Sequence, residues 1–135
     1  MRNIYSKIKP EILLHIVNKK EEIIQKRQDI CPIEEYLQVA SMKLLGGQTF
    51  PPHAHIKQIR TTDIAQESWI ILEGKVEATL YDTDDSILEK VILEPGDCSI
   101  TFRGGHTYKA LEDSFVYEYK TGPYQGQKKD KRFII

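Results

Sequence analysis

Residues 67–81 read ESWIILEGKVEATLY, and this stretch decides the fold. It contains two runs rich in β-branched, aromatic and apolar residues, 68–72 and 76–81, separated by the turn-forming tripeptide EGK. Such a pattern predicts two antiparallel strands joined by a tight turn. Apolar residues occupy both faces of the first run, which indicates a strand covered on both sides.

The same pattern continues through most of the chain. We expect further strands at 36–45, 56–60, 87–93, 98–102, 106–111 and 115–120, with glycine, proline or aspartate turns between them. About eight short strands without intervening helices favour an all-β, antiparallel sandwich or barrel whose sheet edges are closed or covered.

The two ends of the chain differ from this central region. Pro10 fits the first turn of a helix, and Leu13, Ile16 and Val17 then share one helical face, so we expect a helix over about 9–27. Residues 122–135 are turn-rich and basic before an apolar triplet, which predicts either a solvated tail or an added short strand, in this subunit or in a second one. No linker or repeat divides the chain, so 1–135 is expected to be one domain.

The composition excludes several classes of partner. The 135 residues carry 19 lysines and arginines against 20 aspartates and glutamates, a formal net charge of −1, and 40% of them are apolar. This balance gives no global attraction to nucleic acid or to a membrane surface. No signal-peptide region or membrane-length apolar run is present, so we expect a cytoplasmic protein. The two cysteines, Cys31 and Cys98, are expected to be buried free thiols.

Three of the four histidines fall in a pattern suited to binding a metal ion. His53 and His55 are two positions apart, so on a strand both imidazoles would project from one face, about 7 Å apart. Glu67 can offer a carboxylate, and His106 follows Gly104-Gly105, where the backbone can bend. Three imidazoles and a carboxylate suit one divalent transition-metal ion with a position left for water or substrate.

These motifs resemble those of the cupin superfamily. The first cupin motif is similar to G-x5-H-x-H at residues 47–55 followed by E-x6-G at 67–74, and the second is similar to residues 95–106, from P-G-D to a histidine. The resemblance covers about residues 36–121 and implies a double-stranded β-helix, or jelly-roll barrel, to which the helix at 9–27 would be an addition. It implies that His53, His55, Glu67 and His106 hold one ion, which could be iron, manganese, nickel or zinc.

The chain departs from the usual cupin pattern in two places. Eleven residues separate His55 from Glu67, more than is common, and the longer loop could shape the pocket; Phe102 stands where proline is usual. The text around 102–106 and 118–124 also resembles a group of small stand-alone bacterial cupins, some of them associated with carbohydrate or surface-polysaccharide pathways.

Polar residues near these positions are candidates for catalysis. On the strand 115–120, Glu118 and Lys120 share one face and the aromatic residues share the other. If the charged face lines the interior, Glu118 is a candidate acid or base and Lys120 a substrate contact; if not, both are solvated. Tyr108 lies on the same face as His106 and is either a catalytic donor or a core tyrosine.

Two arginines are candidates for substrate binding, and the fourth histidine is not a candidate ligand. Arg60 and Arg103 are candidates for binding an anionic group of the substrate, since a guanidinium can hold a carboxylate or phosphate through two hydrogen bonds. His15, on the expected helix, is expected to be structural or exposed rather than a metal ligand.

We therefore predict a metal-binding cupin that acts as an enzyme on a small polar substrate, carbohydrate-like or acidic, as an isomerase or epimerase, a lyase or a dioxygenase. The alternative is a non-catalytic module that binds or senses a small ligand. We expect a small-molecule ligand, a homodimer that covers the two-faced strand, and neither nucleic acid nor membrane as a partner.

Overall fold

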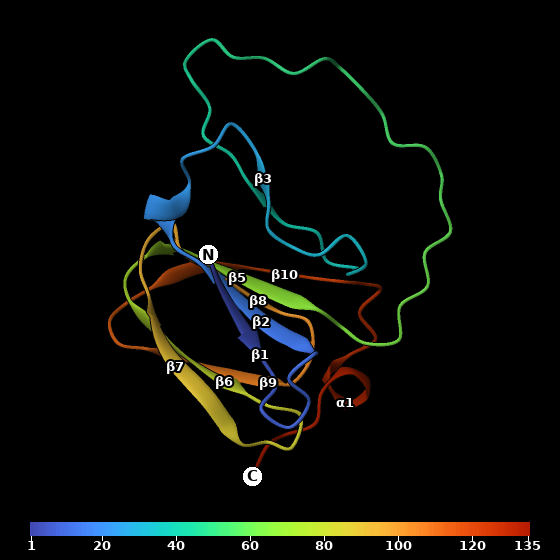
Figure 1. The fold of residues 1–135 in the computed structure, drawn as a ribbon, viewed down its shortest axis with the longest axis vertical. Helices are drawn as coiled ribbons and strands as arrows, with labels where there is room; N and C mark the ends of the chain where they lie inside the picture. Colours follow the sequence, from blue (N-terminus) through green and yellow to red (C-terminus); the bar gives the residue numbers. More distant parts are fainter.

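A computed structural model describes all residues, 1–135, and its main body is two antiparallel sheets packed face to face (Figure 1). The larger sheet has the strand order β1-β2-β8-β5-β10 and the smaller one the order β7-β6-β9. All pairings are antiparallel. The domain is therefore all-β, in an arrangement compatible with a jelly roll.

The strands of the larger sheet are β1 (Arg2–Tyr5), β2 (Leu13–Asn18), β5 (Glu67–Glu73), β8 (Cys98–Thr101) and β10 (Phe115–Lys120). Those of the smaller sheet are β6 (Val76–Tyr81), β7 (Ile87–Leu93) and β9 (Gly105–Ala110). A separate two-residue ladder joins β3 (Gln28–Asp29) to β4 (Ala40–Ser41). The strands expected from residue 68 onward are thus found within one or two residues of their predicted ends.

The helix predicted over residues 9–27 is wrong. Residues 13–18 form β2, which pairs with β1 on one side and β8 on the other, and the only helical turn nearby is η1 (Lys20–Glu22). The reason is that β2 is buried on both faces: Val17 joins the core between the sheets while Ile16 joins a second core outside them. A short apolar run of this kind satisfies helical spacing by coincidence.

Two other segments also differ from expectation. Residues 56–60 form no strand, and of residues 36–45 only Ala40–Ser41 is extended and paired. Neither segment lies beside a long strand that could complete its ladder.

The C-terminal segment contains the short helix α1 (Gln127–Asp130) and no added strand. No helix in the structure combines the length and the apolar character that a membrane crossing needs.

Two apolar cores explain why β5 carries apolar residues on both faces. Ile71 faces the core between the sheets, whereas Ile70 packs against a second core that includes Ile30, Cys31 and Phe102. Segment 30–39 covers this second core, because Leu37 and Val39 pack against it. The chain itself thus covers the outer face of β5, and the homodimer remains a prediction.

Both cysteines are buried and unpaired, as predicted. Burial raises the pKa of the Cys31 thiol to about 11 and also raises that of Cys98. Both side chains therefore serve as small core residues.

Candidate functional site

Two of the four predicted metal ligands meet inside one end of the sandwich. Glu67 begins β5 and His106 is the second residue of β9, and His106 Nε2 lies 3.0 Å from Glu67 Oε1. The Glu67 side chain is 8% exposed and that of His106 20%. Because a carboxylate only accepts hydrogen bonds, Nε2 carries the hydrogen, and the buried Nδ1 of His106 has no partner.

Gly104 allows the backbone to place His106 in the interior. Its φ is +79°, and a Cβ at this position would clash with the carbonyl oxygen of Tyr81. A residue other than glycine would strain this turn, which directly precedes β9. The backbone thus bends at Gly104, directly ahead of Gly105 and His106, as expected from the sequence.

The Glu67 carboxylate has two further partners. Trp69 Nε1 donates a hydrogen bond of 2.8 Å to Oε1, and Lys131 Nζ lies 3.5 Å from Oε2. Burial alone would raise the pKa of Glu67, but the hydrogen bond and charge of His106, the bond from Trp69 and the charge of Lys131 together lower it to about 2. The carboxylate is therefore ionised at neutral pH. We call Glu67 and His106 together the Glu67–His106 centre.

An aromatic wall lies beside the centre. The rings of Trp69 and Tyr108 are stacked, with centroids 4.0 Å apart and planes 14° apart. The Tyr108 hydroxyl is 2.9 Å from Ser99 Oγ, and burial raises the pKa of Tyr108 above its usual range. The neutral ring thus packs as a wall next to His106, and its hydroxyl is already bonded within the sandwich.

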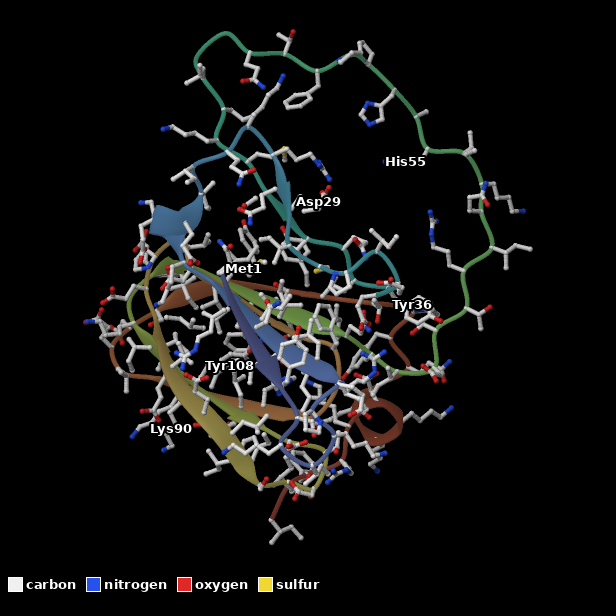
Figure 2. The ribbon with its side chains drawn as sticks, in the orientation of Figure 1. Met1, Asp29, Tyr36, His55, Lys90 and Tyr108 are labelled. Carbon is white, nitrogen blue, oxygen red and sulfur yellow. The ribbon has the colours of Figure 1, made fainter.

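His53 and His55 lie elsewhere. Both are exposed on the long loop between β4 and β5, which arches away from the sheets; Figure 2 shows His55 on this loop and Tyr108 inside the sandwich. Their rings are neighbours, with centroids 5.6 Å apart, but no group of three or more metal-ligating side chains forms anywhere in the structure. The four predicted ligands therefore occur as two separate pairs.

The loop is held only at its two ends. From Thr49 to Ala65, no backbone group is hydrogen-bonded to another backbone group. Three of its apolar side chains, Phe50, Ile56 and Ile59, are 52%, 78% and 93% exposed. Nothing in the fold fixes this segment, which we call the 49–65 loop, against the sandwich.

The remaining predicted site residues are divided between the centre and the surface. Val116 packs against the core between the sheets, so the face of β10 that carries Glu118 and Lys120 is the inner one. Lys120 Nζ is 3.2 Å from Glu118 Oε1, and in the strand register Lys120 lies opposite Glu67. These two residues therefore form a charged pair at the edge of the centre.

The two arginines are not at the centre. Arg60 is exposed on the 49–65 loop and forms no hydrogen bond or ion pair. Arg103 Nη1 is bonded at 2.7 Å to Glu35, whose other oxygen accepts a hydrogen bond from Gln66. Arg103 thereby fastens segment 30–39 to the end of the sandwich, and its guanidinium is in use there.

His15 is structural. It is fully buried, with Nδ1 3.0 Å from Thr101 Oγ1 and Nε2 2.9 Å from the Tyr81 carbonyl oxygen. Its position on β2 rather than on a helix explains why it is buried in the sandwich.

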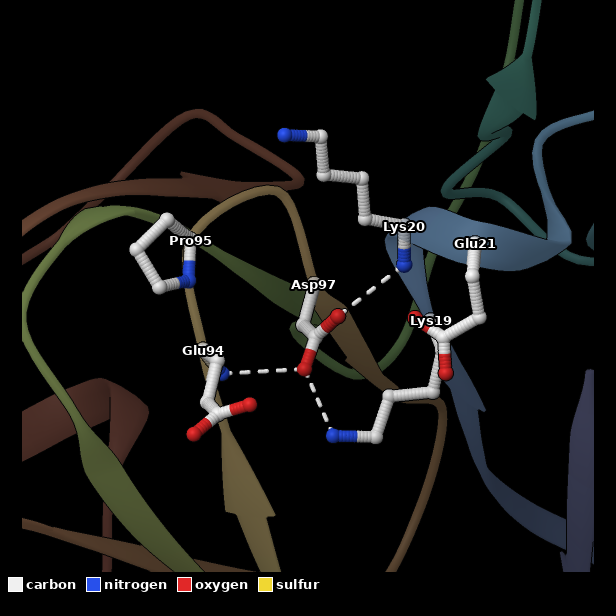
Figure 3. A pocket seen from close by; sticks show the side chains of 6 residues that line it. All are labelled: Lys19, Lys20, Glu21, Glu94, Pro95 and Asp97. Carbon is white, nitrogen blue, oxygen red and sulfur yellow. Dashed lines mark hydrogen bonds and ion pairs between the residues drawn. The ribbon is translucent and has the colours of Figure 1, made fainter.

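A separate hollow of about 340 Å³ surrounds Asp97, far along β8 from Glu67 (Figure 3). The Asp97 carboxylate accepts hydrogen bonds from Lys19 Nζ at 2.6 Å, from the Lys20 amide at 3.0 Å and from the Glu94 amide at 2.9 Å. The two bonds from Lys19 and Lys20 fasten η1 to the turn between β7 and β8, and the bond from Glu94 closes that turn on itself, so this hollow is a structural junction.

One residue near the centre was not predicted from the sequence. Lys131 reaches Glu67 from the C-terminal segment, 64 positions along the chain. No local pattern signals such a contact, because it depends on how the tail returns across the end of the sandwich. Comparison of the chain with family models, with curated proteins and with solved structures finds no match.

Proposed function

We propose that the chain is a cupin-like domain that binds one divalent transition-metal ion with His53, His55, Glu67 and His106 and acts on a small polar molecule. The working form would have the 49–65 loop folded onto the end of the sandwich. The observation that carries this proposal is the buried His106 Nδ1, a nitrogen without a partner on the imidazole whose Nε2 is hydrogen-bonded to the ionised Glu67.

The donor atoms at the centre suit such an ion. An unpartnered buried polar atom is costly unless a ligand or water satisfies it. His106 Nδ1 is one, and Oε2 of Glu67 has only the Lys131 ammonium at 3.5 Å as a charged partner. An imidazole nitrogen and a carboxylate oxygen are donors that zinc, iron, manganese and nickel all accept.

The loop can supply the other two donors. His55 is twelve positions before Glu67, a length of chain that spans up to about 40 Å when extended. Closure would bury Phe50, Ile56 and Ile59, which are exposed now, and each fully buried side chain of this size contributes about 1.5–3 kcal/mol. Both hydrophobic burial and metal coordination would therefore favour the closed loop.

The residues around the centre suit a small polar substrate. A bound ion would polarise a carbonyl or hydroxyl group of the substrate as a Lewis acid. Trp69 and Tyr108 offer an aromatic wall for the apolar side of a sugar-like ring, and Glu118 and Lys120 offer an acid or base and a cation at the edge. Isomerisation or epimerisation, elimination by a lyase, and dioxygenation fit these groups, with carbohydrate metabolism as the setting.

A second candidate is a metal-free module that binds a small ligand. The observation favouring it is that Glu67 and His106 already satisfy each other through one hydrogen bond, without an ion. In this case the free Nδ1 would accept a hydrogen bond from the ligand. The two candidates differ in whether His53 and His55 are needed.

The test is the metal content of the purified protein after dialysis against excess zinc, cobalt, nickel, manganese or ferrous ion, each in turn. We expect about one equivalent of one of these ions in the wild type and loss of it in His53→Ala. His53 is exposed, so this variant should keep the fold, which circular dichroism can check. Gln58→Ala on the same loop is the matched control and should keep the ion. A wild type without stoichiometric metal would overturn the proposal, as would full metal content in His53→Ala.

A further inference from the structure

The C-terminal segment after α1 crosses the end of the sandwich at which the Glu67–His106 centre lies. It makes contacts with the start of β5, with the start of β9 and with the turn between β6 and β7. These three sites lie at the same end of the sandwich, because Tyr81, which precedes the β6–β7 turn, pairs with Gly105, and Glu67 pairs with Thr101, which precedes the turn into β9.

The contact at the centre is the ion pair of Lys131 with Glu67. Lys131 Nζ lies 3.5 Å from Oε2, while Oε1 binds His106 and Trp69. The ammonium therefore stands at the one carboxylate oxygen that the interior of the sandwich leaves free.

Two further contacts fix the segment on either side of the centre. Arg132 binds Asp85 through two hydrogen bonds, of 2.8 Å from Nη1 and 2.6 Å from Nη2. The Ile134 side chain lies so close to Gly105 that a Cβ there would clash with it. Gly105 directly precedes His106, so the segment rests on the backbone that carries the imidazole.

The segment is otherwise weakly held. Residues 131–135 form no strand, and Ile134 is the only one of the five that is not exposed. Exposed ion pairs typically contribute about 1 kcal/mol or less, so the segment can leave the centre without unfolding the sheets. A hollow of about 220 Å³ lies between the base of the 49–65 loop and residues 121–130, directly before the segment.

We propose that residues 131–135 form a strap that closes the Glu67–His106 centre, with Lys131 held on Glu67 until a ligand replaces it. The strap regulates access to the site of the proposed function. Its regulatory role therefore rests on that proposed function. Its closing of the centre can be measured without any metal or substrate.

The experiment measures how fast diethyl pyrocarbonate modifies each histidine in the metal-free protein, followed by mass spectrometry of peptides. The reagent attacks accessible imidazole nitrogens. His53 and His55, both exposed, are internal references for reagent strength, and His15, fully buried, reports any loss of the fold. The variants are Lys131→Met, which removes the contact at the centre, and Arg132→Gln, which removes the anchor on Asp85.

Lys128→Met is the matched control, because Lys128 lies on α1, carries the same charge and makes no ion pair. We expect modification of His106 to be about fivefold faster in Lys131→Met and in Arg132→Gln than in the wild type, with Lys128→Met unchanged. Equal His106 rates in all four proteins would overturn the strap, as would an equal acceleration in Lys128→Met. Faster modification of His15 would mark the acceleration as unfolding and would also contradict the strap.

Metal titration distinguishes this proposal from the proposed function. If both hold, Lys131→Met binds the ion about fivefold more tightly than the wild type, because the ion no longer displaces the ammonium from Glu67. If the wild type binds no ion but diethyl pyrocarbonate still modifies His106 faster in Lys131→Met than in the wild type, the metal function fails and the strap holds. If the wild type binds an ion and Lys131→Met binds it equally well, the strap fails and the metal function holds.

Discussion

The buried imidazole of His15 makes the stability of the fold depend on pH. The Tyr81 carbonyl can only accept a hydrogen bond, so Nε2 carries the hydrogen and Nδ1 accepts one from the Thr101 hydroxyl. The neutral ring is thus fully satisfied. Burial lowers the pKa of His15 from 6.5 to about 4, although the hydrogen bond to the Tyr81 carbonyl opposes this shift.

The size and sign of the effect follow from the two pKa values of His15. Between pH 6.5 and 4 the unfolded chain binds a proton that the folded chain does not, so the free energy of unfolding falls as the pH falls. The slope approaches about 1.4 kcal/mol per pH unit, and the total over this range is about 3 kcal/mol. Above pH 6.5 the contribution is constant. The low pKa of Glu67, about 2, acts in the separate range below pH 4.5.

The assay is urea unfolding followed by circular dichroism at several pH values from 7.5 to 4.5, for the wild type and for His15→Asn. The variant should be less stable at pH 7.5, because a smaller side chain leaves a cavity, yet its stability should fall much less with pH. The exposed His53 and His55 are present in both proteins, so the difference between the two pH slopes isolates His15. Equal pH slopes in the two proteins would refute the reasoning.

Three further substitutions test individual contacts by urea unfolding. Gly104→Ala should lower the free energy of unfolding by about 2 kcal/mol, because φ is +79° and a Cβ would meet the Tyr81 carbonyl; an unchanged midpoint would contradict this. Asp97→Asn should cost about 1–3 kcal/mol through weakened bonds to its three donors, and a neutral result would mean that η1 is held otherwise. Trp69→Phe keeps an aromatic ring against Tyr108 but removes the donor to Glu67, and should lower the free energy of unfolding by about 1 kcal/mol; a stabilised variant would speak against that bond.

The sequence predicted best where short turns mark both ends of a strand. The strands 76–81, 87–93 and 115–120 have their predicted bounds, because each is rich in apolar and β-branched or aromatic residues and short turns mark the ends. The meeting of Glu67 with His106 was also predicted, although 39 positions separate the two residues.

The errors have physical causes. The β2 strand is buried on both faces, so it shows no alternation, and its apolar spacing matched a helix. The segment at 56–60 has the composition of a strand but no partner strand, and pairing is a property of the whole sheet. Lys131 was missed because its contact with Glu67 depends on the path of the tail.

The most direct test of the central claim is nuclear magnetic resonance of the four imidazoles while zinc is added to the protein. If the metal centre forms as proposed, the ring signals of His53, His55 and His106 shift together, and their shifts are complete at one equivalent of zinc. The ring signals of His15 stay in place. If only His53 and His55 shift and His106 does not, the loop binds the ion on its own, and the account of a shared centre with Glu67 and His106 is wrong.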